Sequence, residues 1–386
     1  MSDNAGKIKL LLVTYGLNTI GGLQSWQHLL VHELLRRGHM ITILEMYDYS
    51  ESMPDKRFVR EWNEGIKIIK INGPIVQRGV NPNTNRSALK VVLNVFQKMK
   101  LDRFISKGTF DAMLLPDPNF AFFFFKSTLR RTNCIVQFHS SFDRFKATSK
   151  LRYVLTKRRM SAFKKFLFLS QGDVSKAINN GFDEAKLSYI FNFIDERKYV
   201  EVAKMNIAKT RQLLVVGNLD NPDKQIDHVL RAFSMIDTAV RSNWKIKIVG
   251  DGTTKMSLVQ LSQELEIEQC IEFAGKKANP VNDYFESRFY VLSSSFEGFP
   301  LTLLECIHSN LPIIAYECAP SIVEIVHDNV NGIVVRPGDI GQLSQSMDRL
   351  MRTPELLESM SLKQNEFKEK FGIESTLLAW EKLFSC

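Results

Sequence analysis

The sequence predicts an α/β protein made of two doubly wound domains, each with a parallel sheet between helices. The segment "KIKLLLVTYG" is typical of a buried strand, "SWQHLLVHELLRRGH" of a helix with one apolar face, and "MITILEMY" of a second strand. Strand–helix–strand units of this kind build parallel sheets. The same order restarts at "RQLLVVGNL", and 386 residues are enough for two cores.

Further short apolar segments continue each half. In the first half we expect strands at "IKIIKI", "DAMLLP", "CIVQFHS", "KFLFLS" and "LSYIFNF". In the second half we expect them at "WKIKIVGDG", "CIEFAG", "FYVLSSS", "LPIIAYE" and "NGIVVRPG". The polar stretch 195–210 separates the halves, so we predict one domain at 1–200 and another at 205–371.

Composition narrows the class of protein. Hydrophobic residues make up 44% and charged residues 24%, as in soluble globular proteins. No apolar run reaches the roughly 20 residues that span a bilayer, and the N-terminus lacks the layout of a signal peptide, so we expect a cytoplasmic protein. The five cysteines form no CxxC pair, which indicates reduced, structural thiols.

The formal net charge of +9 is concentrated in residues 144–166, which contain Lys and Arg but no acid. Apolar residues are interleaved with the charges, so we expect a basic amphipathic helix. Such a helix suits an anionic membrane surface or an anionic acceptor. A solvated helix face is the equally simple alternative. Nucleic acid is not expected as a partner, because no nucleic-acid-binding module accompanies the charge.

The stretch "SSSFEGFPLTLLE" contains the main candidate ligand-binding residues. A buried strand ends at Ser293, and the following loop lies at the carboxyl edge of the sheet, where open parallel sheets bind ligands. Pro300 suits the first turn of a helix. The helix N-terminus then offers unsatisfied N–H groups to a phosphate. The groups that would face this phosphate are Gly298 and the N–H groups of Phe299, Leu301 and Thr302.

Two carboxylates bracket this loop. Glu305, inside the helix, can accept hydrogen bonds from a ribose diol, and Glu297, on the loop, can accept them from a sugar hydroxyl. Ribose, diphosphate and sugar together make a nucleotide sugar. The plain alternative is that Glu305 is a surface residue and the loop is merely a tight turn.

Glu297 and Glu305 resemble the Glu-x7-Glu signature of retaining GT-B glycosyltransferases of the glycosyltransferase 4 type. The segment from "SSSFEGF" to "VVRPGD" is similar to that family's nucleotide-binding core over its whole length. The resemblance covers nearly the whole chain, tightly from about 211 to 339. It implies two Rossmann-like domains facing a central cleft, with the C-terminal helix, about 372–386, returning to the acceptor-binding first domain.

The resemblance also assigns roles on the donor side. Glu305 would bind the donor ribose, and Glu297 the donor sugar at its 3- and 4-hydroxyls. Residues 298–302 would present N–H groups to the diphosphate. Lys224 would stabilise the departing nucleoside diphosphate, which gains negative charge in the transition state. An exposed loop lysine is the alternative for Lys224.

One position departs from the family pattern. Asn218 stands where the family usually has an Arg next to the donor phosphates. Either Lys224 then acts largely alone, or another cation such as Lys276, Lys277 or Arg288 helps.

The acceptor-side domain carries weaker signals. The resemblance places His139 of "QFHSS" near the anomeric carbon, although a histidine at a strand end is often structural. Gly21 and Gly22 would face the diphosphate, and Asp117 and Asn119 follow a strand that could line the acceptor side.

We therefore expect a retaining hexosyltransferase that uses a nucleotide sugar, a UDP-sugar by preference. Its acceptor would be a glycan or lipid-linked glycan of bacterial surface polysaccharide synthesis, such as lipopolysaccharide. No metal-ligand spacing is evident, so we expect no metal or other cofactor. The "GDG" of "KIVGDG" is too short for a dinucleotide fingerprint. The alternatives are a GT-B nucleotide-sugar epimerase and a non-catalytic GT-B partner subunit.

Overall fold

The computed structural model describes residues 7–14, 22–46, 66–70, 95–147, 150–205 and 207–385. Gly21 lies outside these residues. The chain divides into two units, the first comprising Met1–Ile190 with Thr376–Cys386 and the second Phe191–Ser375. The last eleven residues thus belong to the first unit, and the polar stretch 195–210 belongs to the second.

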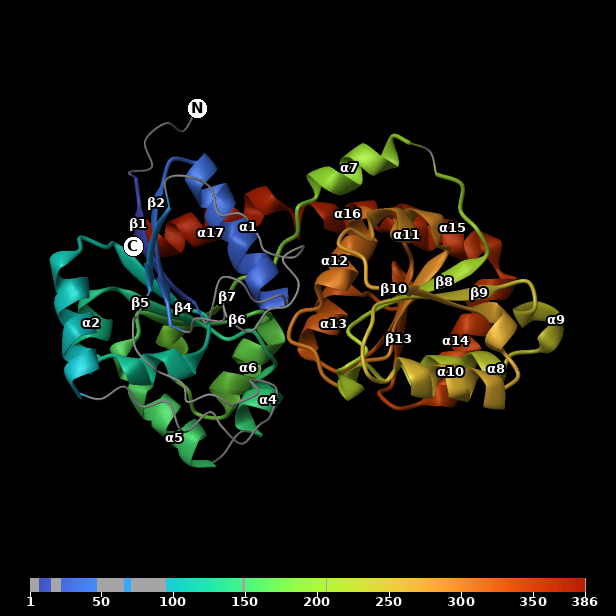
Figure 1. Cartoon of the computed structure of the whole chain (residues 1–386), viewed down its shortest axis with the longest axis horizontal. Helices are drawn as coiled ribbons and strands as arrows, with labels where there is room; N and C mark the ends of the chain where they lie inside the picture. The colour runs from blue at the N-terminus through green and yellow to red at the C-terminus, as the bar shows by residue number, and fades with distance from the viewer. Residues whose placement is uncertain are drawn as a thin grey trace. The chain divides into compact units, whose positions relative to one another are not determined.

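The first unit contains a seven-stranded sheet in the order β3-β2-β1-β4-β5-β6-β7 (Figure 1). Its strands are β1 (Lys9–Thr14), β2 (Met40–Glu45), β3 (Lys67–Lys70), β4 (Ala112–Leu115), β5 (Cys134–Gln137), β6 (Lys165–Phe168) and β7 (Leu187–Tyr189). Its helices are α1 (Gly22–Arg36), α2 (Val95–Lys107), α3 (Lys126–Arg131), α4 (Phe142–Lys146), α5 (Lys150–Arg159), α6 (Gln171–Asn179) and most of α17 (Ile373–Ser385). The strand order reverses between β1 and β4.

Two helices that are distant in sequence lie side by side in this unit (Figure 1). Trp26 of α1 packs on Trp380 of α17, with ring centroids 5.8 Å apart. Glu381 of α17 also accepts hydrogen bonds from Arg37 at 2.8 Å and pairs with His39 at 2.9 Å. The last helix is therefore anchored to the first helix by an apolar contact and to the turn that follows it by polar contacts.

The second unit contains a six-stranded sheet in the order β10-β9-β8-β11-β12-β13. Its strands are β8 (Gln212–Val216), β9 (Lys245–Val249), β10 (Ile271–Gly275), β11 (Phe289–Leu292), β12 (Ile313–Tyr316) and β13 (Gly332–Val335). Its helices are α7 (Arg197–Ala203), α8 (Ile226–Ser234), α9 (Thr238–Arg241), α10 (Lys255–Glu264), α11 (Val281–Glu286), α12 (Leu301–His308), α13 (Pro320–Ile325), α14 (Ile340–Arg352), α15 (Pro354–Lys363) and α16 (Asn365–Lys368).

Every strand pair among the described residues is parallel, which confirms the predicted fold class. Each predicted strand is present, although "LSYIFNF" contributes only Leu187–Tyr189. The buried core of the second unit lies between one face of the sheet and helices such as α8, α10 and α14 (Figure 1). Among the described residues, no helix is both long and apolar enough to cross a membrane.

The prediction of one basic helix over residues 144–166 is wrong. The stretch comprises the end of α4, helix α5, a short 3-10 turn (Met160–Ala162) and the start of β6. The aromatic side chains Phe145, Phe163 and Phe166 are buried because they pack into the core of the first unit. Their spacing reflects a change from helix to strand rather than one apolar helix face.

Candidate functional site

The reversal of strand order in the second sheet falls between β8 and β11. Loops that follow the two strands flanking such a reversal diverge and leave a crevice at the carboxyl edge of the sheet. Here one loop carries Lys224 and the other is residues 293–299, which we call the donor loop after the role expected for it from the sequence. A small hollow at this point is lined by residues that include Val216, Lys224 and Tyr290.

Backbone and side-chain hydrogen bonds of two serines connect the donor loop to the segment that carries Lys224. The N–H of Ser295 donates to the carbonyl oxygen of Asp223 at 2.7 Å, and Ser293 Oγ donates to the carbonyl oxygen of Lys224 at 2.8 Å. On the other side, Ser321 Oγ donates to the carbonyl oxygen of Gly298 at 2.8 Å. These small polar residues hold the loop without filling the space in front of it.

The two glycines of "GDG" have a packing role. A Cβ on Gly250 would lie 1.9 Å from the carbonyl oxygen of Gly217, and one on Gly252 would lie 2.3 Å from the nitrogen of Asp220. Both glycines have positive φ, 155° and 153°. They let the loop after β9 press against the loop after β8, and so help to place the segment that carries Lys224.

Glu297 and Lys224 form an ion pair. Lys224 Nζ donates to Glu297 Oε1 at 2.7 Å, and the exposed fractions of the two side chains are 23% and 13%. The structure thus brings together two residues 73 positions apart that the sequence placed at the sugar and at the phosphates. Each charge compensates the other in a partly desolvated place.

Helix α12 begins beside this pair. Pro300 is its N-cap residue, and no side chain caps the helix N-terminus. The first N–H groups of a helix have no intrahelical acceptor, so those of Leu301 and Thr302 are available to an anion. The Thr302 hydroxyl interacts with Tyr290, whose own hydroxyl donates to the carbonyl oxygen of Val216 at 3.3 Å.

Glu305 lies farther along α12 and is held by two tyrosines. Tyr284 of α11 donates a hydrogen bond to Glu305 Oε2, and Tyr199 of α7 is also hydrogen-bonded to this carboxyl group. Burial raises the pKa of Glu305 to about 6, although both tyrosine hydroxyls act in the opposite direction. The tyrosines stay protonated because burial and the nearby Glu305 raise their pKa values.

Sequence reasoning did not find these tyrosines. Tyr199 lies in the polar stretch taken as a linker, and Tyr284 lies in a helix of only six residues. Both reach Glu305 through tertiary packing, which no local pattern reports.

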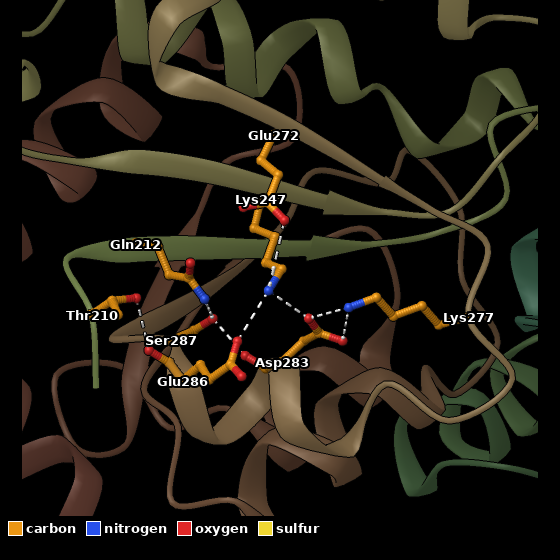
Figure 2. Close-up of polar contacts among 8 residues, drawn as sticks. All are labelled: Thr210, Gln212, Lys247, Glu272, Lys277, Asp283, Glu286 and Ser287. Carbon is orange, nitrogen blue, oxygen red and sulfur yellow. Dashed lines mark hydrogen bonds and ion pairs between the residues drawn. The ribbon is translucent and has the colours of Figure 1, made fainter. Parts of the chain in front are cut away.

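Ion pairs connect helix α11 to the sheet (Figure 2). Lys247, in the middle of β9 and 8% exposed, pairs with Asp283 at 2.7 Å, Glu286 at 3.0 Å and Glu272 at 3.8 Å. Burial alone would lower the pKa of Lys247, but the hydrogen bonds with Asp283 and Glu286 raise it. Asp283 and Tyr284 are neighbours on α11, so this network sets the position of the tyrosine that binds Glu305.

The three cations that could assist Lys224 have contacts or positions of their own in the structure. Lys277 donates to both carboxylate oxygens of Asp283, at 2.7 and 2.9 Å. Arg288 precedes β11, whose carboxyl end carries the donor loop, so it stands at the opposite edge of the sheet. Lys276 acts electrostatically on Asp220, in the loop after β8.

Asn218 supports a turn. Its side-chain oxygen accepts the N–H of Asp220 at 3.0 Å, and its carbonyl oxygen accepts the N–H of Asn221. Asn221 in turn caps the short 3-10 turn Pro222–Lys224, because its side chain accepts the N–H of Asp223 at 3.1 Å. An asparagine in place of the family's arginine therefore shapes the chain that leads to Lys224.

The first unit contains the remaining predicted residues. Gly22 begins α1 after the loop that follows β1. Asp117 follows β4 and caps a 3-10 turn (Pro118–Phe123), where it accepts the N–H of Asn119 at 2.7 Å and a bond from the amide of Asn119. These residues flank the reversal of strand order between β1 and β4, but the Asp117–Asn119 contacts are local capping contacts.

His139 follows β5 and packs against Trp26, with ring centroids 4.6 Å apart. Burial lowers the pKa of His139 to about 3, so the ring is neutral at physiological pH. Among the described residues, its buried Nε2 atom has no hydrogen-bond partner. His139 can therefore exchange a hydrogen bond with a hydroxyl group, but it does not carry a charge.

Residues 200–367 match the family model described as "Glycosyl transferases group 1". This part of the chain, less than half of its length, is similar to members of that family. The match confirms the family expected from the sequence, and it covers the unit that contains Lys224, Glu297 and Glu305. Among the described residues, in this part of the chain and elsewhere, His, Cys, Asp and Glu side chains form no group of three or more that could hold a metal ion.

Two relatives and one solved structure illustrate the similarity. The chain is 29% identical over 200 residues to an uncharacterized glycosyltransferase of Haemophilus influenzae, covering 52% of this chain and 56% of the relative. It is 30% identical over 179 residues to the lipopolysaccharide 1,6-galactosyltransferase of Escherichia coli, covering 45% and 48%. The chain thus spans about half the length of these relatives.

A crystal structure of Anabaena Alr3699/HepE in complex with UDP has the same fold. The TM-score is 0.71 at 14% sequence identity, and the match covers 98% of this chain and 99% of that one. Both units of the chain therefore follow the GT-B pattern of two doubly wound sheets.

The raised pKa of Glu305 predicts how stability depends on pH. The folded-state pKa of about 6 exceeds the ordinary 4.5, so the contribution of Glu305 to stability is present below 4.5 and is lost as the pH rises through about 6. The loss amounts to about 2 kcal/mol. Denaturant unfolding across this range should show it in the native protein but not in Glu305→Gln. Parallel stability curves for the two proteins would contradict the assignment.

The network under α11 predicts a second effect on stability. Asp283→Asn removes the carboxylate that pairs with buried Lys247 and should lower the free energy of unfolding by about 3 kcal/mol. Lys277→Ala is the control, because the Lys277 side chain is 36% exposed and its loss should cost less than about 1 kcal/mol. Chemical denaturation measures both, and equal costs would show that Asp283 acts only through Lys277.

Proposed function

We propose that this chain is a retaining glycosyltransferase that moves a sugar from a UDP-sugar to a glycan or lipid-linked glycan in bacterial surface polysaccharide synthesis. The observation that carries the proposal is the arrangement of Lys224, Glu297 and Glu305 around the uncapped N-terminus of α12. It stands at the strand-order reversal of a group 1 glycosyl transferase domain.

The donor fits this arrangement part by part. The ribose would be held by Glu305, whose carboxylate is kept in place by Tyr199 and Tyr284. The diphosphate would accept N–H bonds from the start of α12 and a charged bond from Lys224. The sugar would reach Glu297. UDP as the nucleotide of the donor is supported by the UDP complex of HepE, which shares the fold.

Donor binding would exchange the partners of the ion pair between Lys224 and Glu297. A diphosphate that approaches Lys224 competes with the Glu297 carboxylate for the same ammonium group. Glu297 then becomes free to accept a hydrogen bond from a sugar hydroxyl. Lys224 stabilises the negative charge that develops on the leaving diphosphate, so the transfer needs no metal ion.

Retention at the anomeric carbon is proposed through substitution on one face of the sugar. The acceptor hydroxyl attacks the anomeric carbon as the bond to the diphosphate breaks, and the leaving phosphate oxygen takes the acceptor proton. His139, neutral at physiological pH, would hydrogen-bond a hydroxyl of the donor sugar without exchanging its proton. Gly21, Gly22, Asp117 and Asn119 remain proposed for the phosphate and acceptor side of the first unit.

The two alternatives are not favoured. The relatives described above are named as glycosyltransferases, and one is a lipopolysaccharide galactosyltransferase. The main support for an inactive partner subunit was Asn218, which now has a separate role in shaping the turn before Lys224. The lipopolysaccharide relative also supports a surface polysaccharide as the acceptor.

We also propose that the first unit binds an anionic membrane surface through α5. Leu151 and Leu155 are one helical turn apart and are 62% and 40% exposed. Lys150 and Arg158 of the same helix are exposed beside them. Other basic residues of the stretch have structural partners: Lys157 donates to the carbonyl oxygen of Asn180 at 2.8 Å, and Arg159 donates to that of Ala121 at 2.9 Å. The membrane-binding residues are thus fewer than the charge count indicated.

The donor proposal is tested by incubating the protein with a panel of nucleotide sugars and measuring UDP release and product anomers. Glu297→Gln should lower release about a hundredfold, whereas Glu355→Gln, at an exposed position on α15, should not. EDTA should leave the rate unchanged. An inverted product would refute retention, an epimerised nucleotide sugar would favour the epimerase, and binding without release would favour the partner subunit.

The membrane proposal is tested by sedimentation with vesicles of phosphatidylcholine, with and without phosphatidylglycerol. The protein should sediment with the anionic vesicles, and Leu151→Ser with Leu155→Ser should weaken this about tenfold. Leu378→Ser removes a leucine on α17 that is 60% exposed and should have no effect. Equal sedimentation with both kinds of vesicle would refute the proposal.

A further inference from the structure

Three phenylalanines meet behind the donor loop. Phe299, the last residue of the loop, is only 5% exposed. Its ring stacks on that of Phe191 with centroids 5.5 Å apart and lies 6.0 Å from that of Phe371. The rings of Phe191 and Phe371 meet edge to face at 5.2 Å. We call these three residues the aromatic cluster.

Two members of the aromatic cluster come from the places where the chain passes between the units. Phe191 is the first residue of the second unit, and Phe371 lies shortly before its last residue, Ser375. We call residues 191–199 and 370–375 the first and second crossing segments. The residue that precedes Pro300 in the donor loop is therefore packed on both crossing segments.

The same segments also contact the rest of α12. Glu196 of the first crossing segment accepts the N–H of Ile373, in the second, at 3.4 Å. The same Glu196 oxygen lies 3.7 Å from Nε2 of His308, the last residue of α12. Tyr199, also in the first segment, is hydrogen-bonded to Glu305 in the middle of the helix. The first crossing segment thus contacts the residue before the N-cap of α12, the middle of the helix and its last residue.

Lys370 adds a fixed cation to the aromatic cluster. Its Nζ atom lies 4.9 Å from the ring centre of Phe371 and 5.5 Å from that of Phe191, and it donates to the carbonyl oxygen of Glu324 at 3.0 Å. A cation over two rings and an edge-to-face ring pair both favour one orientation of the aromatic groups. The cluster is therefore oriented as well as apolar.

We propose that Phe191 and Phe371 are positioning residues that fix the donor loop through Phe299 and couple nucleotide binding at that loop to both crossing segments. The inference rests on the proposed donor site. A shift of the Phe299 ring moves the backbone on either side of it, including Gly298 and the start of α12. Donor binding therefore depends on the crossing segments, and by thermodynamic reciprocity the bound donor restrains them.

The test uses the full chain, UDP as the probe, and a matched pair of variants. Phe371→Leu keeps apolar volume but removes a ring of the aromatic cluster. Phe367→Leu is the control, since Phe367 is also buried and lies four residues earlier, but its ring packs on His327. Phe371→Leu should raise the Kd for UDP about five- to tenfold, while Phe367→Leu should change it less than about twofold. In the native protein and Phe367→Leu, UDP should slow amide hydrogen exchange in both crossing segments, and in Phe371→Leu this slowing should be lost.

The outcomes separate this inference from the proposed function. If the native protein binds UDP but exchange in the crossing segments does not change, or if Phe371→Leu binds UDP like the native protein, the coupling is refuted and the donor site stands. If the native protein binds neither UDP nor any nucleotide sugar, the proposed function itself is wrong.

Discussion

The reversal of strand order between β8 and β11 is the constraint on which the donor side depends. Because the two strands are neighbours, the loops that follow them begin side by side at the carboxyl edge of the sheet before they diverge around a crevice. Lys224 and Glu297 can therefore meet at 2.7 Å. The serines of the donor loop and the close approach of Gly250 to Gly217 then hold this contact in place.

Three sets of candidate residues differ in how the cost of burying a charged group is offset. Glu297 and Lys224 neutralise each other directly. Glu305 is compensated by neutral hydroxyl donors, which leave its pKa raised to about 6. His139 has lost its charge to burial. The proposed donor has a charged diphosphate and uncharged hydroxyls, so it would need both a cation and neutral hydrogen-bonding groups.

The sequence predicted the fold well because buried parallel strands are short apolar runs that need no tertiary information to be recognised. Glu297 and Glu305 were found because the loop and the helix that carry them are continuous in sequence. Tyr199 and Tyr284 were missed because they reach Glu305 from separate helices, 106 and 21 positions away. In the alternating pattern of its strand, Lys247 occupies a position that is typical of an exposed residue, yet the carboxylates of α11 cover it.

The error over residues 144–166 has a related cause. Aromatic residues at irregular intervals fit a helix face and a strand face equally well, and only packing decides between them. About half of the apolar residues of this stretch belong to the buried core of the first unit. Basic side chains such as Lys157 and Arg159 donate hydrogen bonds to backbone carbonyl oxygens. Composition identified the stretch as unusual but did not separate these roles.

Helix α12 begins with Pro300 and lacks the serine, threonine or aspartate that commonly completes the first turn of a helix. Phosphate oxygens bound there would supply the missing acceptors. A nucleotide at this site would thus be a structural part of the helix as well as a substrate, and product release would return the first turn of α12 to its uncapped state. Under the proposed function, the first turn of α12 would have its full set of hydrogen bonds only while the donor is bound.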